Sequence, residues 1–438
     1  MSPTATQREP QKQQAALRMR IPNANSNSLD ANANVNANTA IESDGTINDK
    51  KHSDSKEVWW VNGAFVIAAH CAAVATLVFV SPTWQTVALT ASTIVAGEFG
   101  ITMGYHRLWS HGAFSATPLL RVILAWMGTL GFQGSIRWWV LRHRLHHRYT
   151  DDLVHDPYSA ARGFWFSHMG WIFEKPIYTR MSFIDTSDLS ADWVVRFQHK
   201  YFVPIALTTC FVLPPAIGAL WGDSWAAFLY AGVCARIAIW HLTFCINSFA
   251  HWLGDQHFSE RTTARGGFLL AVLTQGEGYH NYHHEFPRDY RNGPHPLDWD
   301  PTKWLISLAS HFGLAYNLHT QTPNEIAKAR VATTIARAQK YARTLDWGPA
   351  PASLPTVSSL SDVGRFVGHA AWIVVDEFVV DVKRFLDEHA HPGGNAVVQA
   401  WLGKRDGGKG FYGVLNRHTD SAKRMVEMMR VAKLELEE

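Results

Sequence analysis

Apolar residues form four runs that are each about as long as a membrane-spanning helix. The runs lie near residues 58–80, 84–103, 202–221 and 225–249. A helix needs roughly 20 apolar residues to cross the hydrocarbon core of a bilayer. Buried helices of a soluble protein are the alternative, but four such runs in two hairpins favour an integral membrane protein. A shorter apolar stretch, 119–132, is expected to lie in the membrane interface or to pack under a domain outside it.

The two ends of the chain have different patterns. The N-terminal arm is rich in Asn, Ala, Gln, Ser and Lys with almost no aromatic residues, which predicts disorder, and it has no apolar signal-peptide core. Near the other end, DWGPAPASLP is a proline-rich break, followed by the β-like runs AWIVV and EFVVDV, then HPGG and a terminal helix. The pattern predicts a disordered arm (1–55), a membrane-embedded domain (56–345), a linker (346–356) and a C-terminal domain (357–438).

Composition narrows the classes of function. The formal net charge of +3 is too small to indicate a nucleic-acid partner. The four cysteines lie in apolar stretches without Cys-x-x-Cys spacing, which is typical of core or lipid-facing residues rather than of disulfides or metal ligands. The 19 tryptophans fit a membrane protein, because aromatic rings with a polar tip are favoured at membrane interfaces.

Nine histidines are the candidate metal ligands. They fall in the motifs HRLWSH, HRLHH and HNYHH, with a single further histidine in NSFAH. About 0.06 occurrences of His-x-x-His-His are expected by chance from 23 histidines in 438 residues, and the chain has two. An all-imidazole set of this size is too large for one tetrahedral zinc ion and fits two metal ions, with iron as the natural choice for oxygen chemistry. The nine are His106, His111, His143, His146, His147, His251, His280, His283 and His284.

The order of runs and motifs predicts that all nine histidines share one face of the membrane. The first two motifs follow the second run, and the remaining histidines follow the fourth run. Because the third and fourth runs form a hairpin, the chain returns to the side that it left. The loop 105–201 is rich in arginine, which indicates the cytoplasmic side.

Polar residues near or within the apolar runs are candidate partners of the histidines. Glu98, Arg236 and His241 lie inside runs, where such groups are costly and usually face the protein interior. Glu98 is either a partner of a metal-bound histidine or a core acid. Carboxylates near the motifs are better candidates, because a metal-bound imidazole usually donates its other N–H to a carboxylate or carbonyl; solvated loop charges are the alternative. These are Asp151, Asp152, Asp156 and Glu277.

The motifs as a whole resemble the membrane-bound acyl-CoA delta-9 desaturases, the stearoyl-CoA desaturase family, in its fungal form. The resemblance covers residues 58–345 and rests on GITMGYHRLWSH, HRLHHRYTDD, NSFAHWLG, GEGYHNYHHEFPRDYRNG and DWDPTKWLI. It implies an all-α integral membrane desaturase with four transmembrane helices and a cytosolic helical cap. It also implies that the nine histidines hold two iron ions, with Asn247 as a tenth participant through water. The last motif begins with His280 rather than Gln, unlike the front-end desaturases.

Substrate contacts are less well defined by the resemblance. Animal members carry an Arg-Asp pair before the middle motif that contacts the coenzyme, whereas this chain has Leu141 and Arg142. Cationic side chains elsewhere are candidate partners of the coenzyme phosphates, with solubility or lipid-headgroup contact as the alternative. These are Arg137, Arg144, Arg148 and Lys175. The candidates for the acyl tunnel, for which core packing is the alternative, are Met103, Trp139, Thr243 and Phe244.

The C-terminal domain resembles the cytochrome b5 fold, a small α+β domain that binds haem b. The resemblance implies that His391 in HPGG and His418 in NRHTDSA are the two axial ligands, with His389 as the competitor of His391. A bis-imidazole haem transfers electrons and has no open coordination site. A degenerate domain that has lost haem is the alternative. The chain lacks a Gly-rich dinucleotide fingerprint, so a separate reductase is implied.

Together the two resemblances imply a stearoyl-CoA 9-desaturase. Such an enzyme uses O2 and electrons from its cytochrome b5 domain to place a cis double bond between C9 and C10 of palmitoyl-CoA or stearoyl-CoA, in unsaturated fatty acid biosynthesis. The implied partners are long-chain saturated acyl-CoA, membrane lipid and NADH-cytochrome b5 reductase, and the implied location is the endoplasmic reticulum membrane with both termini and the metal site in the cytosol. A fatty-acyl hydroxylase, a desaturase of other regiospecificity, or a haem carrier with a zinc-loaded histidine cluster are the alternatives.

Overall fold

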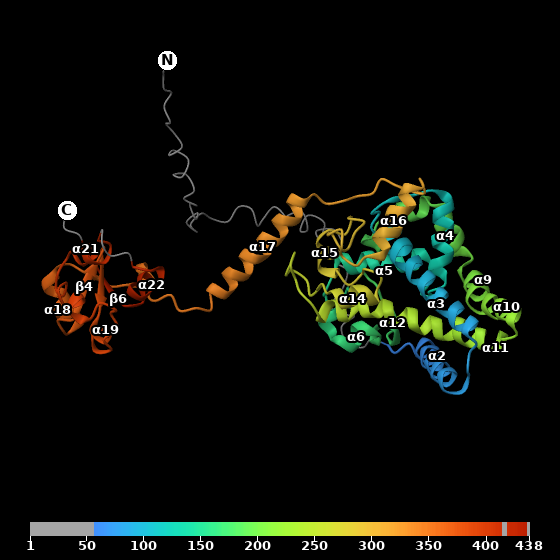
Figure 1. Cartoon of the computed structure of the whole chain (residues 1–438), viewed down its shortest axis with the longest axis horizontal. Helices are drawn as coiled ribbons and strands as arrows, with labels where there is room; N and C mark the ends of the chain where they lie inside the picture. The colour runs from blue at the N-terminus through green and yellow to red at the C-terminus, as the bar shows by residue number, and fades with distance from the viewer. Residues whose placement is uncertain (1–56, 414–417, 436–438) are drawn as a thin grey trace, which may run out of the picture. The chain divides into compact units, whose positions relative to one another are not determined.

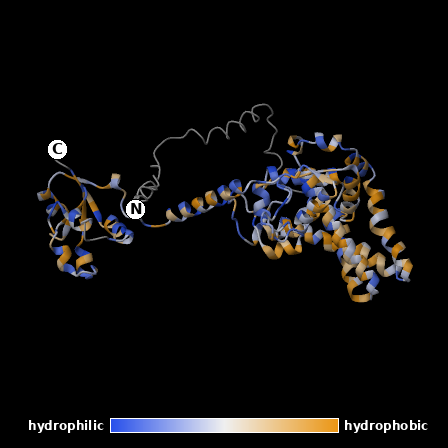
Figure 2. Ribbon diagram, turned by 45° about the horizontal axis from the view of Figure 1, so that its top comes forward, coloured by the Kyte–Doolittle hydropathy of each residue, from blue (hydrophilic) through white to orange (hydrophobic). Residues whose placement is uncertain are grey.

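The computed structural model describes residues 57–413 and 418–435. The predicted disorder of residues 1–55 lies outside the described residues. Four helical segments are long and apolar enough to cross a membrane, as predicted, and they span Trp60–Phe79, Trp84–Ser110, Phe202–Trp221 and Ser224–Trp252. Figure 2 shows apolar residues gathered along these long helices. The predicted start and end of each run agree with the structure, except that the second and fourth segments extend further toward the histidine motifs.

Each of the four segments except the first changes its helical geometry along its length. The first is the single helix α2 (Trp60–Phe79). The second is α3 (Trp84–Phe99), capped by Thr83, and continues as the π-helix η2 (Gly100–Ser110). The third comprises α9 (Phe202–Leu207), η6 (Thr208–Val212), α10 (Leu213–Gly218) and η7 (Ala219–Trp221). The fourth comprises α11 (Ser224–Ala227), η8 (Phe228–Cys234), α12 (Ala235–Asn247) and α13 (Phe249–Trp252).

Shorter helices carry the remaining motifs and the core that supports them. The helix α4 (Pro118–Thr129) matches the predicted short apolar stretch and packs against η2, where Gly104 approaches Leu124. Buried residues of η2, α4, α5 and α8 form one hydrophobic cluster with Ile306. The other elements of this region are α5 (Ile136–Arg148), α6 (Phe164–His168), α7 (Ser187–Ala191), α8 (Trp193–Lys200), α14 (Phe268–Leu273), α15 (His280–Glu285), α16 (Pro301–His311) and α17 (Pro323–Ala342), with the antiparallel pair β1 (Ser115–Ala116) and β2 (Ala315–Tyr316). Short 3-10 turns lie at Ala160–Arg162, Gly170–Phe173, Met181–Phe183 and Pro351–Ser353. Figure 1 shows α3 and α12 side by side with α5 and α15 near their ends.

The C-terminal domain is a small α+β unit, as predicted. Its four strands are β3 (Thr356–Val357), β4 (Trp372–Val375), β5 (Phe378–Asp381) and β6 (Arg430–Leu434), in the order β3-β6-β5-β4. Its helices are α18 (Leu360–Val367), α19 (Lys383–Asp387), α20 (Asn395–Gln399), α21 (Gly407–Phe411) and α22 (Asp420–Met428). The two predicted β-like runs form the hairpin β4–β5. The predicted terminal helix is only partly right, because α22 is followed by β6, which pairs with both β3 and β5.

Candidate metal centre and haem site

The first histidine motif lies on the π-helical turn η2. His106 and His111 are five residues apart, a spacing that an α-helix would place on different faces. In a π-helix the backbone bonds run from i to i+5, and the His111 N–H donates to the His106 carbonyl at 3.2 Å. The two rings therefore lie together, with centroids 4.9 Å apart. Such π-helical turns are rare and frequently occur at functional sites.

The second and third motifs use ordinary helical geometry. Helix α5 is capped by Ser135, whose hydroxyl accepts the Trp138 N–H at 3.2 Å, and its last two turns carry His143, His146 and His147 at i, i+3 and i+4. Helix α15 repeats this spacing with the third motif. All three rings of the middle motif consequently project from one end of a helix that is fixed at its other end by a cap.

The single histidine between these motifs is positioned by a helix break. Helix α12 ends at Asn247, and α13 starts at Phe249 after a non-helical residue, Ser248. After this break, His251 is buried in the cluster, where its Nε2 atom has no hydrogen-bond partner. A buried polar atom without a partner is rare in folded proteins, and metal coordination is one of the explanations for it.

The structure brings all nine predicted histidines together in two groups. Within each group the candidate ligand atoms lie within 4.8 Å of one another. The Nε2 atoms face each other in pairs, with 2.8 Å between His111 and His143 and 3.0 Å between His280 and His284. Nitrogen donors that face one another in two groups fit two metal ions, one in each group. The first group is His106, His111, His143, His147 and His283, and the second is His146, His251, His280 and His284.

Burial favours the neutral, metal-binding form of several of these rings. The cluster is largely buried, although His111, His147 and His284 are partly exposed. Burial is the largest cause that lowers the pKa of His111 and His143 well below the ordinary value, followed by the neighbouring rings. The same two causes lower the pKa of His147, His280 and His284. A neutral imidazole offers one lone pair, so the environment suits metal ligation rather than acid–base exchange.

Carboxylates and a hydroxyl orient the rings through contacts to Nδ1, the nitrogen that points away from the cluster. Nδ1 of His146 is 2.9 Å from Asp156, and Nδ1 of His106 is 2.8 Å from Glu277. Each contact fixes the tautomer that leaves Nε2 free for a metal. Asp156 and Glu277 were both predicted from the sequence as partners of the histidines. Asp152 instead pairs with His155 near the surface, at 3.1 Å, as expected for a solvated loop charge.

His251 is oriented through an intermediate residue. Its Nδ1 atom lies 2.8 Å from the Thr263 hydroxyl, which donates to Asp151 at 2.6 Å. Asp151 thus acts through Thr263, a residue that the sequence patterns did not single out. Glu98, in contrast, is buried without a hydrogen-bond partner and therefore does not orient any of the rings.

A buried arginine was also missed by the sequence patterns. Arg107, which is 1% exposed, donates to Glu277 at 2.9 Å and to Asp300 at 2.9 and 3.0 Å. Burial favours the protonated form of Glu277, but His106 and Arg107 outweigh it and lower the pKa of this carboxyl. The only sequence signal that could have indicated this role of Arg107 was its position directly after His106 in the motif HRLWSH.

The apolar substrate candidates lie around the middle motif and α12. The Trp139 ring stacks on His143 with centroids 4.9 Å apart, and its indole N–H donates to Gln133 at 3.3 Å. Gln133 in turn donates to the Thr243 hydroxyl at 2.8 Å. These contacts connect Trp139 and Thr243 beside the metal cluster. Phe244 and Met103 are both buried, 5% and 4% exposed, as core packing also requires.

The cationic candidates already have partners within the protein. Arg144 forms a bidentate ion pair with Asp188 and donates to two carbonyls of the first motif's turn. Arg148 is exposed and donates to the Phe183 carbonyl at 2.9 Å. The remaining two contacts are from Arg137 to Ser190 at 3.0 Å and from Lys175 to Glu57 at 2.6 Å. Arg148, which pairs with no carboxylate among the described residues, is the best placed for an anionic ligand.

The two predicted haem ligands lie together in the C-terminal domain. The rings of His391 and His418 have centroids 6.2 Å apart, which leaves space for one metal ion between them. Nδ1 of His418 is 2.7 Å from the Phe411 carbonyl, so it donates there and leaves Nε2 free. The competitor His389 instead turns to the Asp387 carbonyl. Partly buried apolar side chains line this side of the sheet and fit a haem face; they include Phe385, Leu386, Val398, Trp401, Leu402 and Phe411.

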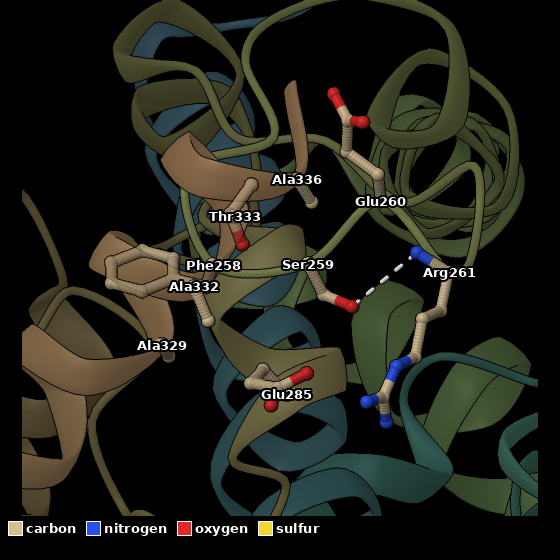
Figure 3. A pocket seen from close by; sticks show the side chains of 9 residues that line it. All are labelled: Phe258, Ser259, Glu260, Arg261, Glu285, Ala329, Ala332, Thr333 and Ala336. Carbon is tan, nitrogen blue, oxygen red and sulfur yellow. Dashed lines mark hydrogen bonds between the residues drawn. The ribbon is translucent and has the colours of Figure 1, made fainter. Parts of the chain in front are cut away.

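A separate pocket of about 330 Å³ lies between α17 and the loop that precedes the third motif. Figure 3 shows that α17 contributes small side chains, while the loop contributes Glu260 and Arg261. The pocket contains none of the nine histidines, and Glu285 is its one residue from α15. It is therefore distinct from the metal cluster. Its lining residues are Phe258, Ser259, Glu260, Arg261, Glu285, Ala329, Ala332, Thr333 and Ala336.

Comparisons with known proteins agree with this geometry. A fatty acid desaturase family model matches residues 82–292, and a model of the cytochrome b5-like heme/steroid binding domain matches residues 361–435. The chain is 41% identical to Acyl-CoA desaturase 1 of Saccharomyces cerevisiae over 77% of its own length and 65% of the relative's length. It is 42% identical to a probable acyl-CoA desaturase of Schizosaccharomyces pombe over 76% and 68% of the two lengths. It is also 37% identical to the Delta(9)-fatty-acid desaturase fat-6 of Caenorhabditis elegans, over 62% and 82%.

Proposed function

The chain belongs to the acyl-CoA desaturases of the fatty acid desaturase family and carries a cytochrome b5 domain, and we propose that it is a stearoyl-CoA 9-desaturase. The proposed reaction places a cis double bond between C9 and C10 of palmitoyl-CoA or stearoyl-CoA. The observation that carries the proposal is the pair of histidine groups, which bring nine imidazoles together in a largely buried site. The C9–C10 position is the one that the resemblance implies.

The nine histidines would hold two iron ions, one in each group, with Asn247 as a further participant through water. Bound iron would supply the redox chemistry that activates dioxygen and removes hydrogens from adjacent carbons. The protein's own contribution is rigid geometry. Glu277 and Asp156 fix the rings of His106 and His146, so that the Nε2 atoms stay directed into the site.

The acyl chain would lie beside Trp139, which stacks on His143 and is tied through Gln133 to Thr243. These hydrogen bonds would hold the side chains that line the acyl chain in place. Their position would decide which carbons lie next to the metal centre, because shifting the acyl chain by one carbon would change the product. Met103 and Phe244 are also proposed to line the acyl chain. Arg148, together with Arg137, Arg144 and Lys175, is proposed to bind the coenzyme phosphates.

The C-terminal domain is proposed to bind haem b through His391 and His418 and to supply electrons. Tethering raises the concentration of the donor at its acceptor into the millimolar range for a short flexible linker. The electrons are proposed to come from NADH through a separate cytochrome b5 reductase.

The four apolar helices indicate a multi-pass membrane protein. We propose that it resides in the endoplasmic reticulum membrane with both termini and the metal site in the cytosol. The proposed domains are 56–345 for the membrane-embedded part and 357–438 for the haem domain, joined by a linker at 346–356.

The test uses the purified full chain with reductase, NADH and stearoyl-CoA that carries deuterium at C9 and C10. Desaturation removes one deuterium from each carbon and gives an alkene, which mass spectrometry detects. Hydroxylation would keep three of four deuterium atoms and add one oxygen. An alkene that retains all the deuterium would contradict the proposed C9–C10 position.

A further inference from the structure

Three imidazoles form a row outside the nine-histidine cluster. His70 comes from α2, His241 from α12 and His168 from α6. The Nε2 atoms of His70 and His241 are 3.0 Å apart, and Nδ1 of His241 is 3.0 Å from Nε2 of His168. Because the middle ring uses both of its nitrogens, the row is linear and no point faces all three rings. The geometry is that of a hydrogen-bonded chain rather than of a metal site.

Both ends of the row meet groups that accept hydrogen bonds. Nδ1 of His70 is 2.7 Å from the Val66 carbonyl oxygen. At the other end, Nδ1 of His168 is 2.9 Å from the Ser248 hydroxyl, which donates to the Phe244 carbonyl oxygen at 2.8 Å. A carbonyl oxygen cannot donate, so each end of the row needs a proton directed outward.

Counting protons shows that the neutral row is one short. The row has five contacts in sequence, from the Val66 carbonyl to the Phe244 carbonyl. Each neutral imidazole supplies one N–H and the serine supplies one O–H, which gives four protons for five contacts. One contact then joins two acceptors. If any one ring is doubly protonated, all five contacts become hydrogen bonds.

The surroundings make such an extra proton exchangeable. The groups that act electrostatically on His241 are His168 and His70. Among the described residues, no carboxylate lies within ion-pair distance of the three rings, while Cys71 and Cys245 are the nearest titratable groups along α2 and α12. Burial lowers the pKa of His168 and opposes the charge, whereas the completed hydrogen bonds favour it. Because burial and the completed hydrogen bonds act in opposite directions, the extra proton on the row is held but can be released.

One end of the row lies beside the metal centre. Ser248 directly follows Asn247, and its carbonyl accepts the His251 N–H at 2.9 Å. Both ends of the row stop at a backbone carbonyl, that of Val66 in α2 and that of Phe244 in α12. A carbonyl cannot pass a proton on, so the row can hold a proton but is not a path through the protein, and the end at His168 and Ser248 is the one next to the metal centre.

We propose that the row of His70, His241 and His168 stores one proton for the reaction. This inference rests on the proposed function, in which a saturated acyl chain, dioxygen, two electrons and two protons give an alkene and two water molecules. The haem domain supplies the electrons. The stored proton is one of the two that are consumed: an imidazolium N–H bond breaks, and an O–H bond of product water forms. Solvent then refills the store.

The first test observes the stored proton without turnover. Histidine labelled with nitrogen-15 is incorporated into the full chain, which carries diamagnetic zinc in place of iron, and nitrogen NMR detects doubly protonated rings. His241→Leu is the informative variant, because it divides the row and leaves three contacts with three protons, so that no extra proton is needed. His311→Leu, at the exposed end of α16, is the control. The wild type and the control should show the imidazolium signal, and His241→Leu should lose it. An unchanged signal in His241→Leu, or none in the wild type, would overturn the proposal.

The second test counts protons during one turnover of the reduced, iron-loaded chain in weak buffer. The wild type should take up one proton from solution in step with product formation and the second one later. His241→Leu should take up both in step with a slower product formation. Uptake of both protons in step by the wild type would contradict storage. If the wild type forms no alkene, the proposed function fails, and the NMR result still decides whether the row holds the proton.

Discussion

The two histidine sites of this chain differ in how firmly they hold their rings. The nine histidines are closed to bulk solvent for the most part, and several are anchored from behind by Asp156, Glu277 or Thr263. His391 and His418 are only half-buried, and the hydrogen bonds of each ring are to backbone groups. The difference fits the two proposed tasks: a site that activates oxygen needs rigid ligands and must exclude water, whereas an electron-transfer site needs an accessible edge.

Removing a ligand from the buried site should have the largest effect. His147→Ala is expected to abolish unsaturated product, because His147 faces His283 at 3.0 Å within the first group. The loss should exceed about 100-fold, the upper range for changes around a metal site. Haem absorbance should be unchanged, since the proposed haem ligands lie in the other domain. Retained desaturation in this variant would refute the assignment of His147.

Removing a proposed ligand from the half-buried haem site should have a large effect that an added protein can reverse. His391→Ala is expected to lose haem absorbance and most turnover, while added separate cytochrome b5 restores product formation. The matched control is His389→Ala, since the His389 ring turns to the Asp387 carbonyl. Loss of haem in the control with retention in His391→Ala would reverse the assignment of the ligand.

Weakening the support of the buried site should have an intermediate effect. Glu277→Gln removes the charge that orients His106 and pairs with Arg107, and it should lower metal affinity by about 10- to 100-fold. Metal retention during dialysis against a chelator measures this change. Asp152→Asn, which alters a carboxylate on the neighbouring surface loop, is the control. Equal metal loss from both variants would show that Glu277 has no specific role.

Removing a positive charge outside both histidine sites should have the smallest effect on turnover. Arg148→Gln is expected to raise the KM for acyl-CoA by up to about fivefold with little change in kcat, because an exposed charge contributes roughly 1 kcal/mol or less. Neither metal content nor haem absorbance should change. A fall in kcat at constant KM would place Arg148 in the chemistry instead of in substrate binding.

The sequence predicted much of the fold because its signals were local. Run lengths predicted the four spans, and helical spacing predicted that the rings of the middle and last motifs project together. The π-helical turn that joins His106 and His111 was not predictable, because the choice between i+4 and i+5 hydrogen bonds depends on packing against α4 and α5. The final strand β6 was also missed, since it is stabilised by partners far away in the sequence, β3 and β5.

The partners of the histidines were predictable only where they lie close in sequence. Asp156 is ten residues from His146 and was found beside its motif. Arg107 and Asp300 are 193 residues apart, and no local pattern links them. Thr263 was missed because a threonine in a loop has no distinctive signal, although the fold places it between His251 and Asp151.

Iron analysis of the purified full chain tests most directly whether the two histidine sites have separate tasks. We predict about two non-haem iron atoms and one haem per chain, with the non-haem iron lost in His147→Ala and the haem lost in His391→Ala. Zinc in the nine-histidine site together with no oxygen consumption on addition of NADH, reductase and stearoyl-CoA would contradict the account.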